Sequence, residues 1–295
     1  MKTFVLYCKT YRNDALRIRR LAQSIQQFNR DQIPFFVSAP FADMEFFRKL
    51  LDGLPLTLIN DEDIIHANPA LDPEKINALP GSKSQQIVKS EFWRLGISDS
   101  YLCIDSDCIF IRPFSQSDFI TPDGYPYTIV HEAKELLQFS INHGMEMVAD
   151  DFHKERQKIM GIFGRTGHHY DFGPSPLLWS NQVWKELDQK FLKPRNMNFY
   201  DAIMLFPGEM QWYGEAMLKY RPIPLTPVEP YFKFYLYERQ LIVAKQQGET
   251  IERLARNYLG VGYQSNWERN YDYDQKPFLS RLARWIRRRV FKRYR

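Results

Sequence analysis

The chain has few cysteines and no long apolar run, and both absences narrow its class. Its 295 residues include only three cysteines, Cys8, Cys103 and Cys108, without a Cys-x-x-Cys spacing. A disulfide framework and a thiolate zinc site are therefore not expected, and a reducing compartment fits best. No run of about 18 apolar residues is present, so we expect no membrane-spanning helix. The apolar run at residues 4–8 is too short for a signal peptide.

Internal repeats and low-complexity segments are also absent, which excludes repeat arrays and fibrous chains. Hydrophobic residues make up 44% of the chain and charged residues 25%, so the chain can build a sizeable core and is not globally disordered. Its length suits one large α/β domain, because no linker rich in Gly, Ser or Pro divides it.

The positive charge of the chain is concentrated at one end. The formal net charge is +5, from 40 Lys and Arg against 35 Asp and Glu. Residues 281–295 hold eight of the basic residues and no acid, so residues 1–280 carry 32 basic against 35 acidic residues. A body with a net charge of −3 argues against a nucleic-acid-binding surface, and we expect no nucleic-acid partner.

Apolar, β-rich runs alternate with segments of helical periodicity along the chain. The runs that predict strands are residues 3–8, 33–38, 56–59, 101–104, 108–111, 127–131 and 177–179. Helices are expected at residues 15–28, capped by Asp14, and at 44–51, 84–95, 145–163, 182–191, 209–219, 235–247 and 278–294. This alternation predicts an α/β domain over residues 1–275, with a mostly parallel sheet flanked by helices, and a basic helix at 276–295.

The most informative segment is YLCIDSDCIFIRPF, residues 101–114, in which a buried strand ends in Asp105 and Asp107. In an open α/β sheet, ligands bind beyond the carboxyl ends of the strands. Residues two apart in an extended chain point to one side, so both carboxylates can bind one divalent cation. Oxygen ligands favour Mg²⁺ or Mn²⁺ and leave sites for phosphate oxygens. The alternative interpretation is a polar turn at the end of a strand.

Three short motifs in this order resemble the GT-A glycosyltransferases, and more narrowly a bacterial group of polysaccharide or lipopolysaccharide sugar transferases. The first is a Gln-Gln-x-x-Lys helix, the second a DSD strand end and the third a Glu-x-x-x-Tyr-Gly helix. They correspond to Gln85, Gln86 and Lys89, to Asp105, Ser106 and Asp107, and to Glu209, Tyr213 and Gly214. The resemblance covers residues 3–267 and departs at Gln211, where that group often has a second acid.

The resemblance implies a nucleotide-sugar donor whose diphosphate is held by Mn²⁺ or Mg²⁺ on Asp105 and Asp107. On the donor side it places the loop after the first strand, with Thr10, Tyr11 and Arg12, together with Gln86, Lys89 and Ser106. In that loop, Tyr11 would stack on the base and Arg12 would contact phosphate. A solvated loop remains the alternative for 10–12, and a surface salt bridge for Lys89. The late polar trio Gln264, Ser265 and Asn266 is expected to close over the donor phosphates.

An inverting transferase also needs a general base for the acceptor hydroxyl. Glu209 stands at the start of an expected helix, whose N-terminus favours an ionised carboxylate, and Glu215 is the second candidate. A simple capping role for Glu209 is the alternative. On the acceptor side the resemblance implies His169 and Asp171, from the loop at residues 167–180, and Tyr213. The adjacent pair His168 and His169 lacks the spacing of a metal site.

The basic C-terminal segment has the composition of a helix in an anionic lipid interface. On a helical wheel, apolar residues between 279 and 294 share about a third of the circumference, and most arginines lie opposite. We therefore expect the protein in the cytoplasm, peripheral on the inner face of the cell membrane, with a glycan or lipid-linked acceptor. A helix packed on the body is the alternative. Two other functions stay open: a nucleotidyltransferase acting on sugar phosphates, although residues 9–15 lack glycine, and a non-catalytic membrane-surface binding protein.

Overall fold

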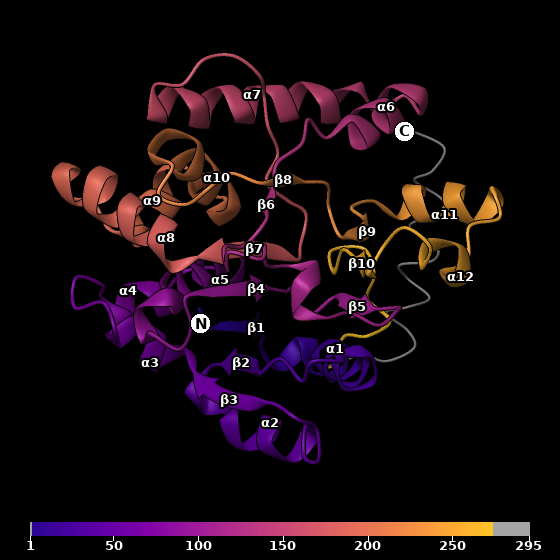
Figure 1. The fold of residues 1–295 in the computed structure, drawn as a ribbon, viewed down its shortest axis with the longest axis horizontal. Coiled ribbons are helices and arrows are strands. Elements are labelled where there is room, and N and C mark those ends of the chain that lie inside the picture. The colour runs from indigo at the N-terminus through magenta and orange to yellow at the C-terminus, as the bar shows by residue number, and fades with distance from the viewer. Residues whose placement is uncertain (1, 274–295) are drawn as a thin grey trace.

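The computed structural model describes residues 2–273, and its centre is a five-stranded sheet (Figure 1). The helix expected at 276–295 lies outside the described residues. The sheet contains, in spatial order, β3 (Thr57–Asn60), β2 (Phe35–Ala39), β1 (Phe4–Lys9), β4 (Ser100–Cys103) and β7 (Leu177–Ser180). The first four run parallel and β7 runs antiparallel to β4. The prediction of an α/β fold with a mostly parallel sheet is therefore confirmed.

Side chains that alternate along each strand divide the core into two clusters, one on each face of the sheet. Leu6 and Cys8 of β1 face one cluster, and Tyr7 faces the other. On the Leu6 face the sheet is covered by α1 (Ala15–Phe28) and α2 (Met44–Leu50). The Tyr7 face is covered by α3 (Asp61–His66), α5 (Gly81–Glu91), α8 (Asn181–Leu187), α9 (Phe199–Leu205) and α10 (Glu209–Tyr220).

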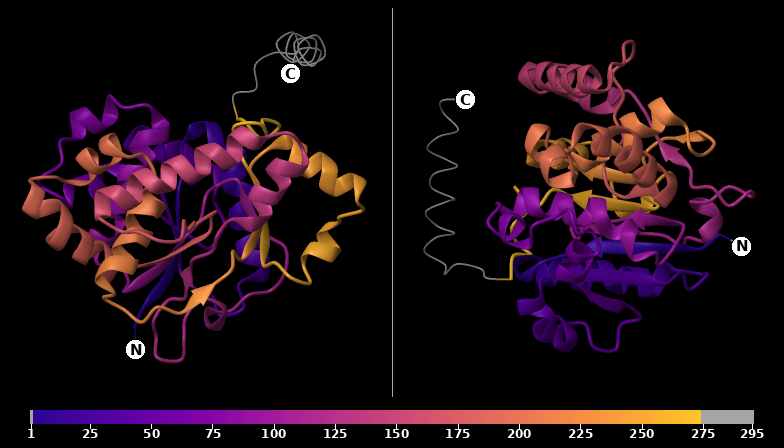
Figure 2. Two further views of the ribbon diagram at one scale, coloured as in Figure 1. Left: turned by 90° about the horizontal axis from the view of Figure 1, so that it is seen from above. Right: turned by 90° about the vertical axis from the view of Figure 1, so that its left-hand side faces the viewer.

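A further layer lies outside α10. The long helix α7 (Glu146–Phe163) runs above α8, α9 and α10 in Figures 1 and 2, with α6 (Lys134–Asn142) leading into it. Two small sheets complete the described part of the fold: β5 (Cys108–Phe110) with β10 (Gly260–Tyr263) and β9 (Phe232–Tyr235), and β6 (Thr128–Ile129) with β8 (Pro227–Val228). The remaining helices are α4 (Pro73–Asn77), α11 (Glu238–Gln246) and α12 (Ile251–Leu254).

Most expected strands and helices are found, but three local predictions are wrong. Asp14 makes no side-chain capping bond at the start of α1, because its carboxylate binds Arg17 and Ser106 instead. The helix expected from residue 235 begins only at Glu238, because Tyr235 belongs to β9. The strand expected at 127–131 is reduced to the two residues of β6.

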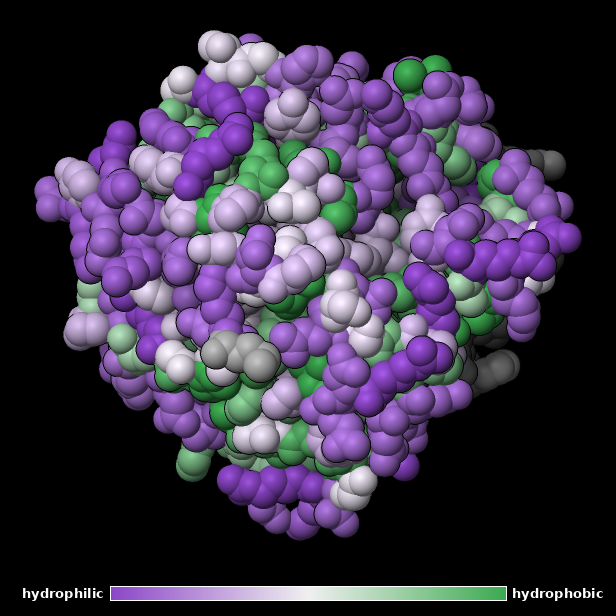
Figure 3. Space-filling model, in the orientation of Figure 1, coloured by the Kyte–Doolittle hydropathy of each residue, from purple (hydrophilic) through white to green (hydrophobic). Residues whose placement is uncertain are grey.

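No helix among residues 2–273 is long and apolar enough to span a membrane. On the face of the molecule seen in Figure 3, apolar side chains form small groups between polar ones. This agrees with the sequence, which has no apolar run of spanning length.

Candidate active site

The site is built where the chain leaves β4 at the carboxyl edge of the parallel strands. Tyr7 of β1 lies beside Cys103 of β4, so both strands end at the same edge. After β4 the chain makes a tight turn over residues 105–108, in which the Cys108 N–H donates to the Asp105 carbonyl at 3.1 Å. The backbone is therefore not extended through Asp105 and Asp107. The prediction that an extended chain points both carboxylates to one side is wrong. The turn instead sends its three polar side chains, Asp105, Ser106 and Asp107, to three different partners.

Asp105 points toward α5 and α10, where Lys89 binds it. The Lys89 ammonium donates to Asp105 Oδ1 at 2.5 Å and to Glu209 Oε1 at 3.3 Å. Lys89 and Glu209 are almost fully buried, with side chains 5% and 6% exposed, whereas the Asp105 side chain is 35% exposed. We call these three residues the Lys89 cluster. Because one cation faces two carboxylates, the cluster carries a net negative charge and opens to solvent at Asp105.

The pKa of Lys89 shows how tightly this cluster is coupled. Burial alone would lower that pKa, but the charges of Asp105 and Glu209 outweigh the burial and raise it well above its ordinary value. Lys89 is therefore a permanent cation inside the site.

Glu209 reaches Lys89 because the start of α10 is fixed by α5. The Gly208 N–H, just before the helix, donates to Gln86 Oε1 at 2.7 Å. Gly208 has φ +138° and a Cβ there would meet the Gln211 side chain, so glycine is required at this bend. Gln86, expected on the donor side, thus positions the loop that carries Glu209.

Asp107 points toward the end of β10. Its Oδ2 accepts the Ser265 N–H at 2.9 Å, and its carbonyl accepts the Tyr263 N–H at 3.1 Å. Burial and the charge of Asp105 raise the pKa of Asp107 to about 7, against the opposing hydrogen bond from Ser265. The two carboxylates are therefore close enough to repel one another. Of the late polar trio, Ser265 reaches the turn through its backbone.

Ser106 points toward α1, into a second charge cluster that we call the Arg17 cluster: Arg17, Asp14 and Asp272. The Ser106 hydroxyl donates to Asp14 Oδ2 at 3.0 Å. The Arg17 guanidinium donates to Asp14 Oδ1 at 2.8 Å, to Asp272 Oδ1 at 2.6 Å and to the Glu268 carbonyl. Ser106 thus ties the turn to α1, and its role on the donor side remains a prediction.

The residues that support the turn were only weakly indicated by the sequence. Asp14 and Arg17 are three residues apart at the start of a helix, which is a common local pair. Their partner Asp272 is 255 residues away from Arg17 in sequence and carried no signal. Ser175 carried none either, yet its hydroxyl accepts the Asp105 N–H at 2.8 Å.

The donor set at the turn suits a hard divalent cation in type but not in number. Carboxylate oxygens are what Mg²⁺ and Mn²⁺ prefer, and Asp105 and Asp107 would hold such a cation. Its charge would offset the Asp105 charge, which together with burial raises the Asp107 pKa. Across residues 2–273, however, no group of three or more His, Cys, Asp or Glu is arranged to hold a metal. The protein would therefore supply two carboxylates, and the other ligands would be substrate oxygens or water.

The loop after β1 is separated into a buried and an exposed part. Thr10 is fully buried and its hydroxyl has no partner among the described residues, while Tyr11 is 45% exposed. Arg12 pairs with Asp43 at 3.5 Å and stacks on Phe46. In this conformation the Arg12 guanidinium binds residues at the start of α2 and does not contact Asp105 or Asp107. The stacking and phosphate roles of Tyr11 and Arg12 remain predictions.

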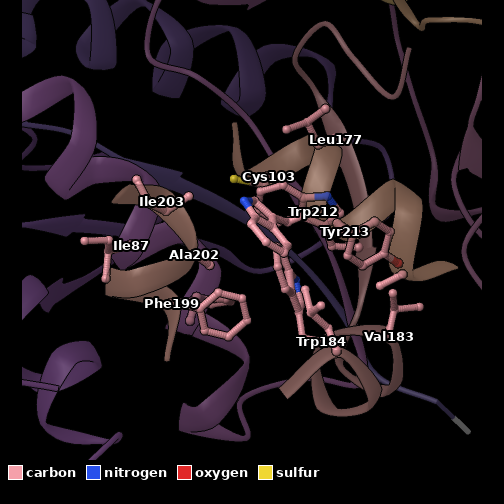
Figure 4. Packing of buried hydrophobic residues seen from close by; sticks show 14 of the residues in the cluster. Ile87, Cys103, Leu177, Val183, Trp184, Phe199, Ala202, Ile203, Trp212 and Tyr213 are labelled. Atoms are coloured by element: carbon pink, nitrogen blue, oxygen red, sulfur yellow. The ribbon is translucent and has the colours of Figure 1, made fainter. Parts of the chain in front are cut away.

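Two site predictions on α10 need correction. Glu215 is fully buried and binds the Arg165 guanidinium through two hydrogen bonds of 2.6 Å, so it is a neutralised structural residue without access to a substrate. Tyr213 lies in the core among Trp184, Trp212 and Leu177 (Figure 4), and its hydroxyl accepts the Ser180 N–H at 2.8 Å. A hydroxyl used in this way inside the core has no face toward an acceptor.

The two residues predicted on the acceptor side from the loop at 167–180, His169 and Asp171, differ in their surroundings. Asp171 Oδ1 accepts from the Arg156 guanidinium at 2.7 Å, and its backbone pairs with that of His131. His169 is half-buried and its Nδ1 lies 2.9 Å from Nδ1 of His153 on α7. Burial and the neighbouring charges of His153, Arg165 and Arg156 lower the His169 pKa. Asp171 lines a cavity, which His169 does not, so only Asp171 retains a position suited to ligand contact.

Comparison with known proteins places this geometry in a wider context. A family model described as "Family of unknown function (DUF6492)" matches residues 4–269. No curated protein matches the sequence.

Among the solved structures that match in fold are two glycosyltransferases. One is described as the apo structure of WbbM, a bifunctional glycosyltransferase, with 9% identity, a TM-score of 0.48 and 89% of the present chain covered; the chain spans 46% of the WbbM chain. The other is the galactosyltransferase LgtC in complex with donor and acceptor sugar analogues. It shows 12% identity, a TM-score of 0.47, and coverage of 94% of the present chain and 99% of its own.

Proposed function

The chain belongs to the DUF6492 family, and we propose that it is a glycosyltransferase of the GT-A type. It would transfer a sugar from a nucleotide-sugar donor to a glycan or lipid-linked acceptor in cell-surface polysaccharide synthesis. The observation that carries the proposal is the placement of Asp105, Asp107, Lys89 and Glu209 around one turn at the carboxyl end of β4. This edge of an open α/β sheet is where ligands bind.

Each of these residues has a task in sugar transfer that its geometry allows. Asp105 and Asp107 would hold Mn²⁺ or Mg²⁺, which would stabilise the negative charge of the departing nucleoside diphosphate. Lys89 fixes the exposed carboxylate of Asp105 and adds a permanent positive charge to the site. Glu209, at the N-terminus of α10 and beside Lys89, would accept the proton of the acceptor hydroxyl.

The test is donor binding and hydrolysis by the full chain. Thermal-shift assays with UDP-, GDP- and CMP-sugars, with and without Mn²⁺, should show one donor that stabilises the protein only when Mn²⁺ is present. D107N should lose this response, and its hydrolysis rate should fall at least ~100-fold, because the variant lacks the charged carboxylate that would bind the cation. D123N, which changes an exposed loop aspartate, is the matched control. Full activity in D107N would refute the assignment. Pyrophosphate release from a nucleoside triphosphate and a sugar phosphate would instead indicate the nucleotidyltransferase.

We also propose that residues 279–295 bind an anionic membrane surface and place the protein on the inner face of the cell membrane. The support is the charge pattern: eight basic residues and no acid in residues 281–295. The triple variant R287E/R288E/R289E should lose cosedimentation with phosphatidylserine vesicles. The control reverses three exposed basic residues of the body, Arg48, Lys49 and Lys75. Equal sedimentation of both variants and the wild type would contradict the proposal.

A further inference from the structure

A cavity of about 470 Å³ lies between the start of α6, the loop around Asp171 and strand β9. Its volume is within the range of about 300–1,000 Å³ that is usual for small-molecule sites. Apolar side chains that line it include Phe232, Phe234 and Pro174, and polar ones include Asp171, Glu132 and Glu229. Apolar and carboxylate groups therefore meet in one partly open cavity.

The cavity shares two walls with the turn that carries the acids. On one side, Pro174 lines the cavity, and the next residue, Ser175, accepts the Asp105 N–H at 2.8 Å. On the other side, Phe234 lines the cavity and pairs with Gly262 of β10, which in turn pairs with Cys108, the residue after Asp107. A molecule in the cavity would therefore lie next to the proposed donor site.

The charges of the lining select among possible occupants. Four carboxylates line the cavity, from Glu132, Glu135, Asp171 and Glu229. Three of them are paired with cations, Glu132 with Lys134, Glu135 with Lys233 and Asp171 with Arg156, so Glu229 leaves one uncompensated negative charge. The uncompensated charge of Glu229 disfavours a phosphate, whether it comes from a nucleotide or from a lipid headgroup. A hydrocarbon chain is also disfavoured, because it would desolvate the Glu229 carboxylate without offering it a hydrogen-bonding partner.

A sugar ring matches both parts of the lining. Its C–H faces pack against Phe or Pro side chains, and its hydroxyls donate to carboxylates. Asp171 is held in place by the Arg156 guanidinium at 2.7 Å, so it is preorganised. Glu229 is exposed and, among residues 2–273, has no hydrogen bond or ion pair, so its oxygens are available to hydroxyls.

We propose that this cavity binds the acceptor of the reaction as an uncharged or amino-substituted pyranoside, with Asp171 and Glu229 accepting its hydroxyl hydrogens. The inference rests on the proposed glycosyltransferase function and names the class of acceptor for the same site. It excludes acceptors whose bound unit is a phosphate or a uronic acid.

Binding is measured first without any donor. Saturation-transfer NMR of the full chain with methyl α-glucoside, methyl α-galactoside, glucosamine and methyl glucuronide should show contact with one of the first three and not with the glucuronide. E229Q should weaken that binding by on the order of tenfold, because a charged hydrogen-bond acceptor is lost. E74Q, at an exposed glutamate of α4, is the matched control.

A second variant, L136W, fills the cavity from the start of α6. It should abolish pyranoside binding and transfer while the donor-dependent thermal shift and donor hydrolysis persist. If the wild type hydrolyses the donor but pyranoside binding survives in both E229Q and L136W, the acceptor inference is overturned and the proposed function is not. Inorganic phosphate or glucuronide binding that L136W removes would also overturn it. Absence of any donor response in the wild type would instead count against the proposed function.

Discussion

The Lys89 cluster and the Arg17 cluster flank the same turn and share one composition, a buried cation with two carboxylates. In the first, Lys89 binds Asp105 and Glu209; in the second, Arg17 binds Asp14 and Asp272. They differ in the cation and in access to solvent. The Lys89 cluster ends in Asp105, which is 35% exposed, whereas Asp14 and Asp272 are 13% and 19% exposed.

The two cations also differ in how they bind their partners. The planar guanidinium of Arg17 donates to two carboxylates and to the Glu268 carbonyl, so it fixes three chain segments at once. The ammonium of Lys89 is a point charge on a flexible stem that can change partners when a ligand enters. We infer that the Arg17 cluster holds the turn in place and that the Lys89 cluster is the side on which chemistry occurs.

The strongest test of this comparison is K89M. It leaves Asp105 and Glu209 facing each other without a cation, so we expect a loss of about 3–5 kcal/mol in the free energy of unfolding and loss of activity. Urea denaturation measures the first and donor hydrolysis the second. The double variant K89M/E209Q should recover part of the stability but none of the activity. Stability unchanged in K89M would show that the cluster is not coupled as its geometry indicates.

The two glutamates of α10 sharpen the same point. E209Q keeps the Lys89–Asp105 pair and removes only the proposed base, so kcat for transfer should fall by about 10²–10⁴ with little change in donor affinity. E215Q is the matched control on the same helix, because Glu215 binds Arg165 instead of Lys89. It should lower stability modestly and leave kcat unchanged. Steady-state kinetics of both variants measure this difference. An equal loss of kcat in E209Q and E215Q would show that Glu209 is not distinguished from Glu215 as the base.

R17M should have a smaller effect than K89M and a different one. Asp14 and Asp272 remain partly exposed when the guanidinium is lost, so we expect a destabilisation of about 2–4 kcal/mol. Amide hydrogen exchange should rise at residues 264–272, where Arg17 holds the Glu268 carbonyl and Asp272. Exchange in this segment should stay unchanged in E209Q. Equal protection in R17M and the wild type would show that Arg17 does not anchor it.

The sequence indicated the sheet and the placement of Asp105 and Asp107 at the end of a buried strand, because both signals are local. A buried strand before the turn and helical periodicity on either side are readable within about 20 residues. The partners of the turn were not readable in this way. Ser175, Asp272 and the buried environment of Tyr213 depend on contacts between distant segments, and Glu209 and Glu215 look alike in sequence although only one faces Lys89. The reasoning from an extended chain failed because a tight turn replaces it.

A third cluster of an arginine and two carboxylates lies away from the turn and can be compared with the two clusters that flank it. Arg94 binds Glu91 and Asp188, and Glu91, which is fully buried, also accepts from Asn68 at 2.7 Å. Burial raises the Glu91 pKa to about 7 although the Arg94 charge opposes this. The folded protein thus holds a proton on Glu91 more tightly than the unfolded chain, whose glutamate pKa is about 4.3.

We therefore expect the free energy of unfolding to depend on pH through Glu91, without a matching change in activity. The contribution of Glu91 to stability is complete below about pH 4.3 and is lost as the pH rises through about 7. Between about pH 5.5 and pH 7.5 the wild type should lose on the order of 1–2 kcal/mol that E91Q does not lose. Urea denaturation of both proteins at the two pH values measures the difference. If the unfolding free energies of the wild type and E91Q changed in parallel with pH, Glu91 would already be ionised in the folded state. The Arg94 charge would then outweigh the effect of burial.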